Sequence, residues 1–272
     1  KVDGSAYNDG SGDNSSGCGD GVTITTCSGY ELTQDIDFDE DGDGDIADEA
    51  YFNDNAGWEP IGGSSNKFTA TFEGNGYRIS NLYINRPDDN YAGLFAYAQN
   101  NIFRNVSING SVAGNDRVGM LCGACFYPEM SDVSVSGSVS GDDYVGGIGG
   151  MTSIWSGSAL RMEGSIVATG TQSGGLFGYA DGLLVTDAVF IGSLSGGDKV
   201  GGLAGFSAYY KISDSYVDAT INASGDKVGG MLGYGDTVYA SHIDNSFALG
   251  SVTGANSVGG LLGQYDMYSN KK

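Results

Sequence analysis

The chain has 272 residues, which is enough for one large domain or two small ones and for a sizeable buried core. Glycine accounts for 48 residues and proline for three, which argues against a helical protein because glycine inside a helix costs roughly 0.5–1 kcal/mol relative to alanine. The formal net charge of −22 makes nucleic acid and anionic lipid poor partners. No apolar run approaches the roughly 20 residues of a membrane span, so we expect no membrane insertion. The composition predicts a soluble, secreted or cell-surface, all-β protein. Because the chain begins with Lys1 rather than Met, we expect that a leader was removed.

Residues 1–66 differ in composition from the rest of the chain. They are rich in Gly, Ser, Asp and Asn and contain no repeat. A stack of repeats needs its end covered, because an open strand ladder can pair with another molecule. We therefore expect residues 1–66 to form a loop-rich cap on a second region, residues 67–272.

The four cysteines fall into two local pairs. Cys18 and Cys27 lie in the cap segment, whereas Cys122 and Cys125 form a C-G-A-C motif. An even count with local pairs predicts small structural disulfides in an oxidising compartment, although free thiols at Cys122 and Cys125 are an alternative. A redox pair or half of a zinc site at C-G-A-C is less favoured, because the sequence has no second C-x-x-C and no βαβ pattern around the motif.

The cap segment carries the densest run of acidic residues, between Asp37 and Glu49. Carboxylates alternate along this run and glycine follows the third of them, which is the arrangement of a Ca²⁺-binding loop. The pattern departs from the EF-hand template and looks more like the Ca²⁺ loops of thrombospondin type 3 repeats. The alternative is a solvated acidic loop without an ion. We predict a Ca²⁺ site with the ligands Asp37, Asp39, Asp41, Asp43, Asp45 and Asp48.

A short glycine-containing motif recurs seven times along the second region. The copies begin at Tyr91, Val118, Val145, Ser173, Val200, Val228 and Val258, with spacings of 27, 27, 28, 27, 28 and 30 residues. Alternating stretches such as residues 106–112 and 133–139 lie between the copies and are typical of half-buried strands. A period of 20–50 residues indicates a repeat architecture.

Two further columns of residues follow the same period. One is predicted to consist of turn residues that tolerate a left-handed backbone: Asn81, Asn105, Asp132, Glu163, Asp187, Asp214 and Asn245. In the other, Arg117, Lys199 and Lys227 each follow an aspartate directly before the glycine motif. We expect these three cations to form a structural charge ladder on the surface.

These patterns predict a parallel β-helix, or β-solenoid, of about seven to eight coils. One coil cannot bury its apolar side chains alone, but stacked coils form continuous apolar columns. We expect the paired glycines to provide positive φ at corners and to allow close backbone approach. The predicted core consists of Val118, Leu121, Val145, Ile148, Leu176, Val200, Leu203, Val228, Leu232, Val258 and Leu261.

The G-[GM]-[LIM]-x-G core of the motif, with following strands such as residues 243–248, resembles the GLUG repeat of bacterial secreted and cell-surface proteins. The resemblance covers about residues 91–265, and residues 58–82 are similar to the segment that often precedes such repeats. It implies a β-helical region of a large adhesin or surface protein, sometimes accompanying peptidase or carbohydrate-active modules. Two copies depart from the pattern, because Ala92 and Ala96 replace glycines in the first and Cys122 enters the second.

Aromatic residues recur at one phase of the repeat, after the glycine motif. Exposed rings in a row can stack on sugars or on an apolar protein surface, whereas the alternative is that they pack over the coil edges. The predicted ligand-binding residues are Tyr127, Trp155, Tyr179, Tyr209, Tyr210, Tyr234 and Tyr239.

These rings favour an extracellular adhesion or interaction module whose partner is a carbohydrate or protein on a cell surface. One alternative is a structural subunit that stacks end to end with itself into a filament. A polysaccharide-degrading β-helix enzyme is a further alternative. It is less favoured because no residue stands out from the repeat as a catalytic site would, so we expect no enzymatic activity and name no catalytic residue.

Overall fold

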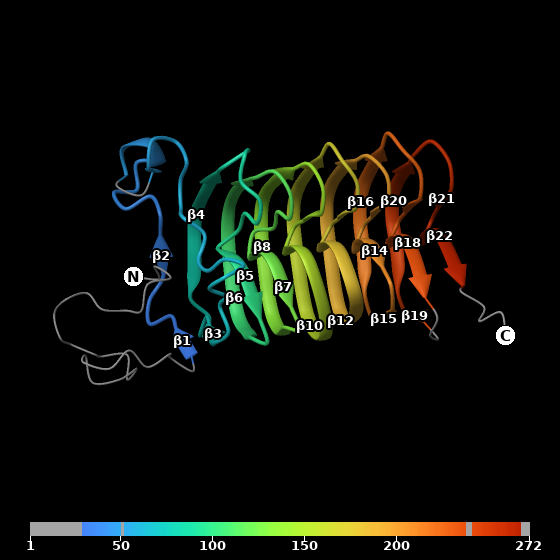
Figure 1. The fold of residues 1–272 in the computed structure, drawn as a ribbon, viewed down its shortest axis with the longest axis horizontal. Helices are drawn as coiled ribbons and strands as arrows, with labels where there is room; N and C mark the ends of the chain where they lie inside the picture. Colours follow the sequence, from blue (N-terminus) through green and yellow to red (C-terminus); the bar gives the residue numbers. More distant parts are fainter. Residues whose placement is uncertain (1–28, 50–51, 238–240, 268–272) are drawn as a thin grey trace.

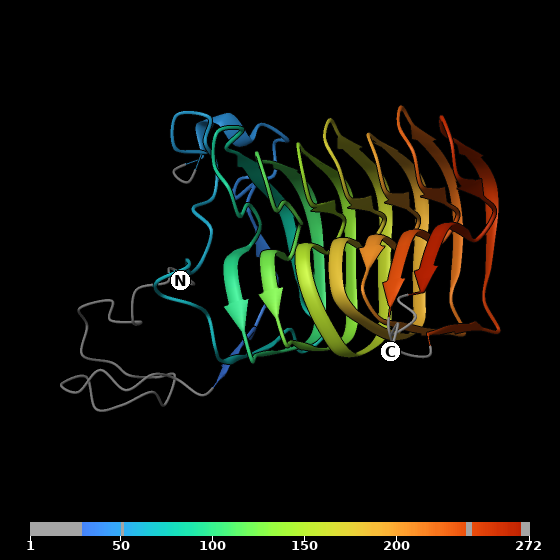
Figure 2. The same cartoon turned by 45° about the vertical axis from the view of Figure 1, so that its right-hand side comes forward.

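The computed structural model describes residues 29–49, 52–237 and 241–267. The chain is a parallel β-solenoid of about seven turns with essentially no helix, which confirms the predicted fold class. Successive turns lie side by side along the long axis of the molecule, so that the chain advances from one end of the rod to the other (Figure 1). The view turned by 45° shows the strands of neighbouring turns aligned in flat ladders (Figure 2).

Each full coil has three sides. The first is a short strand at the glycine motif, and these strands form a five-stranded parallel sheet: β9 (Val145–Gly146), β11 (Ser173–Gly174), β13 (Val200–Gly201), β17 (Val228–Gly229) and β21 (Val258–Gly259). The second side follows the motif: β5 (Phe95–Gln99), β7 (Cys122–Phe126), β14 (Ala204–Ser207), β18 (Leu232–Thr237) and β22 (Leu262–Met267). The third side returns to the next motif: β3 (Thr71–Glu73), β4 (Arg78–Asn85), β6 (Ile102–Ala113), β8 (Glu129–Gly141), β15 (Tyr210–Ser213), β16 (Tyr216–Ala223), β19 (His242–Asp244) and β20 (Phe247–Thr253). Two long strands run through both of these sides, β10 (Gly149–Ala168) and β12 (Phe177–Gly196).

The ladders are parallel, and like residues stack on like residues. Between β6 and β8, Val106 pairs with Val133 and Ser111 with Ser138, and the two serine hydroxyls are 2.9 Å apart. Every second side chain of such a strand points inward, so one register places a whole column of Val, Ile and Leu in the interior. Residues one period apart in the sequence therefore stack on one another in neighbouring coils and make the same kind of contact.

The predicted core is confirmed for nine of its eleven residues, which are all buried. The prediction is wrong for Val258 and Leu261, which are 44% and 39% exposed. Both belong to the last described coil, and no further coil covers them. Their equivalents one coil earlier, Val228 and Met231, are fully buried. Position in the stack, rather than residue type, decides their burial.

Left-handed backbone recurs in two columns of the repeat. The first holds Asn81, Asn105, Asp132, Asp187, Asp214 and Asn245, whose φ values lie between 45° and 57°. The prediction that Glu163 belongs to this column is wrong. Its member in that coil is Ala159, with φ 52°. Ala159 lies 27 residues after Asp132, so the structure keeps the period that the assignment of Glu163 breaks.

The structure pairs Ala92 rather than Tyr91 with Val118, so the first copy of the motif begins one residue later than predicted. The second left-handed column lies directly before the motif, at Tyr91, Arg117, Tyr144, Gln172, Lys199, Lys227 and Ser257. The expectation that the paired motif glycines themselves provide positive φ is therefore wrong. Their role in close approach is clear, because a Cβ on Gly175 would lie 2.0 Å from the carbonyl oxygen of Gly202 in the next coil. The motif glycines allow neighbouring coils to stack.

The N-terminal end of the rod is covered by residues of the segment expected as a cap. β1 (Gly29–Glu31) pairs with β3, and β2 (Ile36–Asp37) pairs with β4. Leu32 and Phe38, which follow these strands, are 5% and 7% exposed and belong to the apolar core. A single turn of 3₁₀ helix, η1 (Ile46–Asp48), closes the acidic loop that follows.

Cys122 and Cys125 form a disulfide across one turn of chain, with their Cα atoms 6.2 Å apart. Both side chains are fully buried inside the coil. Gly149 lies above Cys122 in the ladder, and a Cβ there would be 3.3 Å from the Cys122 sulfur. The disulfide fills a core position that phenylalanine occupies in other coils, at Phe95 and Phe177. Cys18 and Cys27 lie outside the described residues.

Candidate functional site

The predicted metal ligands and the exposed predicted aromatic residues lie in two regions. The first is the acidic loop after β2. The aspartate carboxylates of this loop accept hydrogen bonds from its backbone N–H groups. The Asp41 carboxylate accepts a hydrogen bond from the N–H of Asp43 at 3.1 Å, and Asp43 accepts from Asp45 at 2.7 Å. Asp39 accepts from the N–H groups of Gly42 and Gly44, which have φ of 75° and 86°. Glycine is suited to both positions because it adopts a left-handed backbone without steric cost.

The folded loop brings two triads of carboxylates together. Oxygen atoms of Asp39, Asp41 and Glu49 lie within 4.8 Å of one another, and so do those of Asp41, Asp43 and Asp48. Four of the six predicted ligands thus share one cluster. Glu49 was missed, because a twelve-residue frame starting at Asp37 ends one position before it. Its carboxylate also accepts hydrogen bonds from the N–H groups of Glu40 and Asp41, at 2.6 Å and 3.4 Å.

The two other predicted ligands are engaged elsewhere. Asp37 accepts a hydrogen bond from the Asn81 side-chain amide at 2.7 Å, which ties β2 to the first coil. Asp45 is the N-cap of η1 and accepts from the N–H of Ala47 at 2.9 Å. The structure places neither of them in a triad.

The negative charges of these clustered carboxylates repel one another. Desolvation and then the negative charges of Asp43 and Asp41 raise the pKa of the Asp48 carboxyl above its ordinary value. Converging carboxylate oxygens are the ligands that Ca²⁺ prefers, and a divalent cation would relieve this repulsion. The donor set of Asp39, Asp41, Asp43, Asp48 and Glu49 therefore fits a hard cation.

The second region is a corner of the solenoid, where the second side of each coil meets the third. Tyr127 follows β7 and is 53% exposed. Trp155 is 52% exposed and lies in β10 where the register shifts between Ile154 and Gly157. Tyr209, between β14 and β15, is half-buried with its ring centroid 6.3 Å from that of Trp155. These three rings form what we call the aromatic corner.

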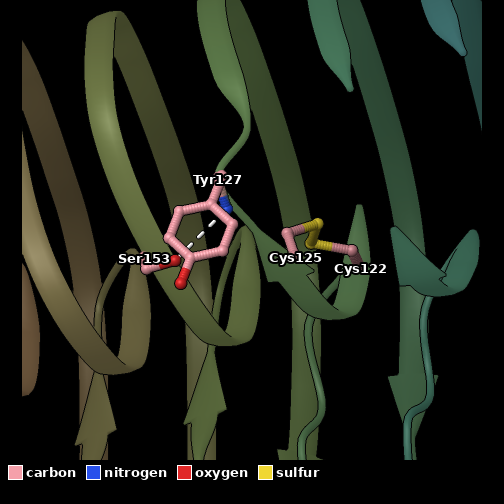
Figure 3. Close-up of a disulfide and its surroundings, with 4 residues drawn as sticks. All are labelled: Cys122, Cys125, Tyr127 and Ser153. Atoms are coloured by element: carbon pink, nitrogen blue, oxygen red, sulfur yellow. Dashed lines mark hydrogen bonds between the residues drawn. A yellow bond between two sulfur atoms is a disulfide. The ribbon is translucent and has the colours of Figure 1, made fainter. Parts of the chain in front are cut away.

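The aromatic corner is held by the coils beneath it. The N–H of Tyr127 donates to the Ser153 hydroxyl of the next coil at 3.2 Å, as Figure 3 shows. Trp155 lies over Gly182, where an added Cβ would be 3.4 Å from the indole ring. The exposed Lys211 ammonium lies 5.7 Å from the centroid of the Tyr209 ring. The corner therefore presents partly exposed aromatic side chains that neighbouring coils support.

The remaining predicted aromatic residues pack within the repeat. Tyr179 stacks on Phe206 with centroids 4.9 Å apart, and Phe206 contacts Tyr234 at 5.5 Å. Tyr210 and Tyr234 are 4% and 9% exposed, so the expectation that they are displayed is wrong. The Tyr234 hydroxyl donates to Asp266 at 2.9 Å. Tyr239 lies outside the described residues.

The three cations of the basic column, Arg117, Lys199 and Lys227, lie over aromatic rings, which sequence reasoning missed. The Arg117 guanidinium lies 5.1 Å from both the Tyr91 and the Tyr144 ring centroids. The Lys227 ammonium lies 4.1 Å from the Tyr234 ring, seven residues later. The expected charge ladder is thus a set of cation–π contacts. Of its three cations, Arg117 alone forms a salt bridge with the preceding aspartate in the described structure, at 3.7 Å to Asp116. A seven-residue spacing, which Lys199 and Phe206 share with Lys227 and Tyr234, could have indicated the two lysine contacts but not those of Arg117.

Comparison with known proteins gives two partial matches. The chain is 39% identical over 97 residues to a putative Gly-rich membrane protein of Evansella cellulosilytica, covering 35% of this chain and 10% of that protein. It is 37% identical over 106 residues to halomucin of Haloquadratum walsbyi, covering 38% of this chain and 1% of halomucin. The chain thus spans a tenth or less of the length of these relatives. No family model and no solved structure matches. Among the described residues, no helix has the length and apolar character needed to cross a membrane.

Proposed function

We propose that the chain is an extracellular, non-enzymatic binding module, a GLUG-type rod that presents the aromatic corner to a carbohydrate or protein on a cell surface. The names of both relatives suit a surface or extracellular setting. The observation that carries the proposal is the exposure of Tyr127 and Trp155 on a rigid, coil-supported backbone. The Trp155 ring is also in contact with the Tyr209 ring, and a cluster of exposed aromatic rings can mark a binding site.

Carbohydrate is the partner that the corner favours. Flat rings stack on the apolar faces of sugars, and Tyr and Trp carry polar groups that can bond sugar hydroxyls at the rim. Beside the rings, the exposed Lys211 ammonium lies 5.7 Å from the Tyr209 ring centroid and can donate hydrogen bonds to a sugar. The net charge of −22 disfavours polyanionic glycans, so we expect neutral ones.

A glycan array followed by titration calorimetry tests this proposal. We expect the chain to bind neutral glycans. Trp155→Ala should raise the dissociation constant at least about tenfold, which is the effect of losing one central aromatic contact. Val167→Ala is the matched control, because Val167 is 50% exposed on the same strand but lies away from the corner. Binding that survives Trp155→Ala would contradict the role of the corner. Binding to intact cells but to no glycan would point to a protein partner instead.

We further propose that Ca²⁺ binds the acidic loop and stabilises the N-terminal end of the rod. Asp39, Asp41, Asp43, Asp48 and Glu49 supply the oxygen ligands, and the loop is tied to the first coil through β2 and β4. A cation that binds only the folded loop raises stability by RT ln(1 + [L]/Kd), which is about 2.7 kcal/mol at a concentration 100 times Kd.

Thermal unfolding with Ca²⁺ and with excess chelator tests the metal. We expect a higher melting temperature with Ca²⁺, and we expect Asp41→Asn to abolish the difference because Asp41 belongs to both triads. Asp37→Asn is the control, since Asp37 is in neither triad and an asparagine oxygen can still accept the hydrogen bonds from Asn81 and from the N–H of Asp39. Identical melting curves in chelator and in Ca²⁺ would remove the ion from this proposal without affecting the aromatic corner.

A further inference from the structure

The segment W-E-P-I-G, residues 58–62, belongs to neither of the sites described above and is fixed to the backbone that follows it. The N–H of Trp58 donates to the Tyr83 carbonyl oxygen at 2.8 Å, and the N–H of Ile61 donates to that of Leu94 at 3.0 Å. The Ile61 side chain is buried in the core. The segment is therefore held in place by the fold, and a site built on it is formed before a ligand binds.

A hollow of about 530 Å³ lies between this segment and the turn that follows it. Two backbone hydrogen bonds between Gly63 and Asn66, at 2.9 Å and 3.2 Å, close the turn. Gly62 enters it with φ 82°, a conformation that glycine adopts without steric cost. The volume is within the range of about 300–1,000 Å³ that is typical of small-molecule sites. We call this cavity the Trp58 hollow, and its lining residues are Trp58, Glu59, Pro60, Gly62, Gly63, Ser64, Ser65 and Asn66.

Trp58 provides an aromatic wall of the hollow. Its indole N–H donates to the Leu94 carbonyl oxygen at 3.4 Å, and its ring centroid lies 5.3 Å from that of Phe38. Because the N–H is directed at the coil, the side chain offers ring carbons to the hollow rather than a hydrogen-bond donor. Aromatic carbon surface of this kind stacks on the C–H face of a sugar ring.

The remaining wall offers hydrogen-bonding groups. Ser64, Ser65 and Asn66 are exposed, and in the part of the chain that the structure describes their side chains form no hydrogen bond with another residue. Glu59 is exposed as well, and its carboxylate can accept hydrogen bonds from hydroxyl groups. A ligand that satisfies both walls has an apolar ring face and several hydroxyl groups.

The charges around the hollow favour a neutral ligand. The Glu59 carboxylate lies 2.6 Å from the Arg86 guanidinium, which is also 3.4 Å from the Asp89 carboxylate. Lys67 follows the turn, and its ammonium group donates to the Gln99 side chain at 2.7 Å. Both cations are engaged within the protein, so neither is available to an anionic ligand. The guanidinium also compensates the charge of Glu59, which reduces the attraction for a cationic one.

We propose that the Trp58 hollow binds one neutral sugar residue. The apolar face of the sugar lies against the indole, and its hydroxyl groups bond the side chains of the polar wall and the Glu59 carboxylate. The hollow lies before the first repeat, whereas Trp155 and Tyr209 of the aromatic corner belong to later coils. The inference therefore goes beyond the proposed function and does not rest on the role of the aromatic corner.

Saturation-transfer NMR and titration calorimetry of the full chain with the methyl glycosides of glucose, galactose, mannose and N-acetylglucosamine test this inference. We expect at least one glycoside to bind, and Trp58→Ala should raise its dissociation constant at least about tenfold. Because Trp58 also packs against Phe38, a second variant combines Ser64→Ala with Ser65→Ala and removes only exposed hydroxyl groups. It should raise the dissociation constant at least about fivefold. Circular dichroism checks that both variants keep the fold.

Thr69→Ala is the matched control, because Thr69 is an exposed hydroxyl residue shortly after the turn that does not line the hollow. It should leave the dissociation constant unchanged. The inference is overturned if none of the four glycosides binds, or if neither hollow variant weakens binding more than the control does. Binding that is lost in Trp155→Ala but kept in Trp58→Ala would assign the sugar to the aromatic corner. That result would overturn this inference and leave the proposed function intact.

Discussion

Replacing Gly175 by alanine should destabilise the solenoid strongly, because of the contact between two coils. A Cβ at this position would lie 2.0 Å from the Gly202 carbonyl oxygen and 2.4 Å from atoms of the Phe190 ring. The carbonyl belongs to the ladder of the next coil, and Phe190 is fully buried. Neither neighbour can move without disturbing the stack, so the added methyl group must push the coils apart.

The magnitude follows from two opposing effects. Overpacking of a well-packed core costs about 1–3 kcal/mol, and a clash with backbone belongs at the upper end of that range. Alanine also restricts the unfolded chain, which returns about 0.4–1 kcal/mol. We expect Gly175→Ala to lose about 2 kcal/mol of unfolding free energy. In a domain of this size the melting temperature should fall by about 4–8 °C.

Gly260→Ala is the matched control for this prediction. Gly260 has the same place in the motif, neither glycine has positive φ, and a Cβ on Gly260 would meet nothing within 4 Å. We expect a change between none and about 1 kcal/mol of added stability. Urea unfolding followed by circular dichroism measures both variants. Equal destabilisation by the two substitutions would refute the stacking argument and assign the motif glycines a conformational role.

Three further predictions concern Ala159, Tyr210 and the Cys122–Cys125 disulfide. Ala159→Asn should add about 1 kcal/mol of stability in urea unfolding, because alanine is disfavoured at φ 52° and asparagine tolerates it; Glu163→Asn should give no such gain. Burial, and next the interaction with Tyr265, raises the pKa of Tyr210 to about 12 from its ordinary value of 10.0. The folded state therefore holds the phenolic proton more tightly than the unfolded chain does. Its contribution to stability is present below pH 10 and is lost as the pH rises towards 12, and melting curves across this interval should show a smaller loss for Tyr210→Phe. Ellman's reagent should detect no thiol from Cys122 or Cys125 in folded protein treated with reductant and then desalted, because both side chains are buried. The double alanine variant should lose about 2 kcal/mol by chain-entropy reasoning.

The sequence was sufficient for the architecture because the fold has a single repeating unit. The spacing of the glycine motif fixes the length of a coil, and the alternation of apolar residues fixes which side chains point inward. Val118, Val145, Val200 and Val228 could therefore be placed in one buried column without knowledge of the path between them. The position of a residue within the repeat therefore predicts whether its side chain is buried or exposed.

The errors arise where phase alone is insufficient. Val258 has the correct phase but no described coil above it, so its exposure depends on the stack and not on the motif. Ala159 has the backbone of an Asn/Asp position without the residue type, and residue type drew the assignment to Glu163. Tyr209 and Tyr210 are adjacent in sequence, and only the geometry of the corner decides that the first is accessible and the second is buried.

These departures from the repeat coincide with the proposed sites. Trp155 lies at a register shift in β10, whereas the neighbouring pairs of that ladder continue in phase. The acidic loop lies outside the seven motifs. A stacking column stabilises the rod only when each position repeats what lies below it. A side chain that breaks the column loses that stabilisation, so the breaks are where selection for binding can act with the least conflict with folding.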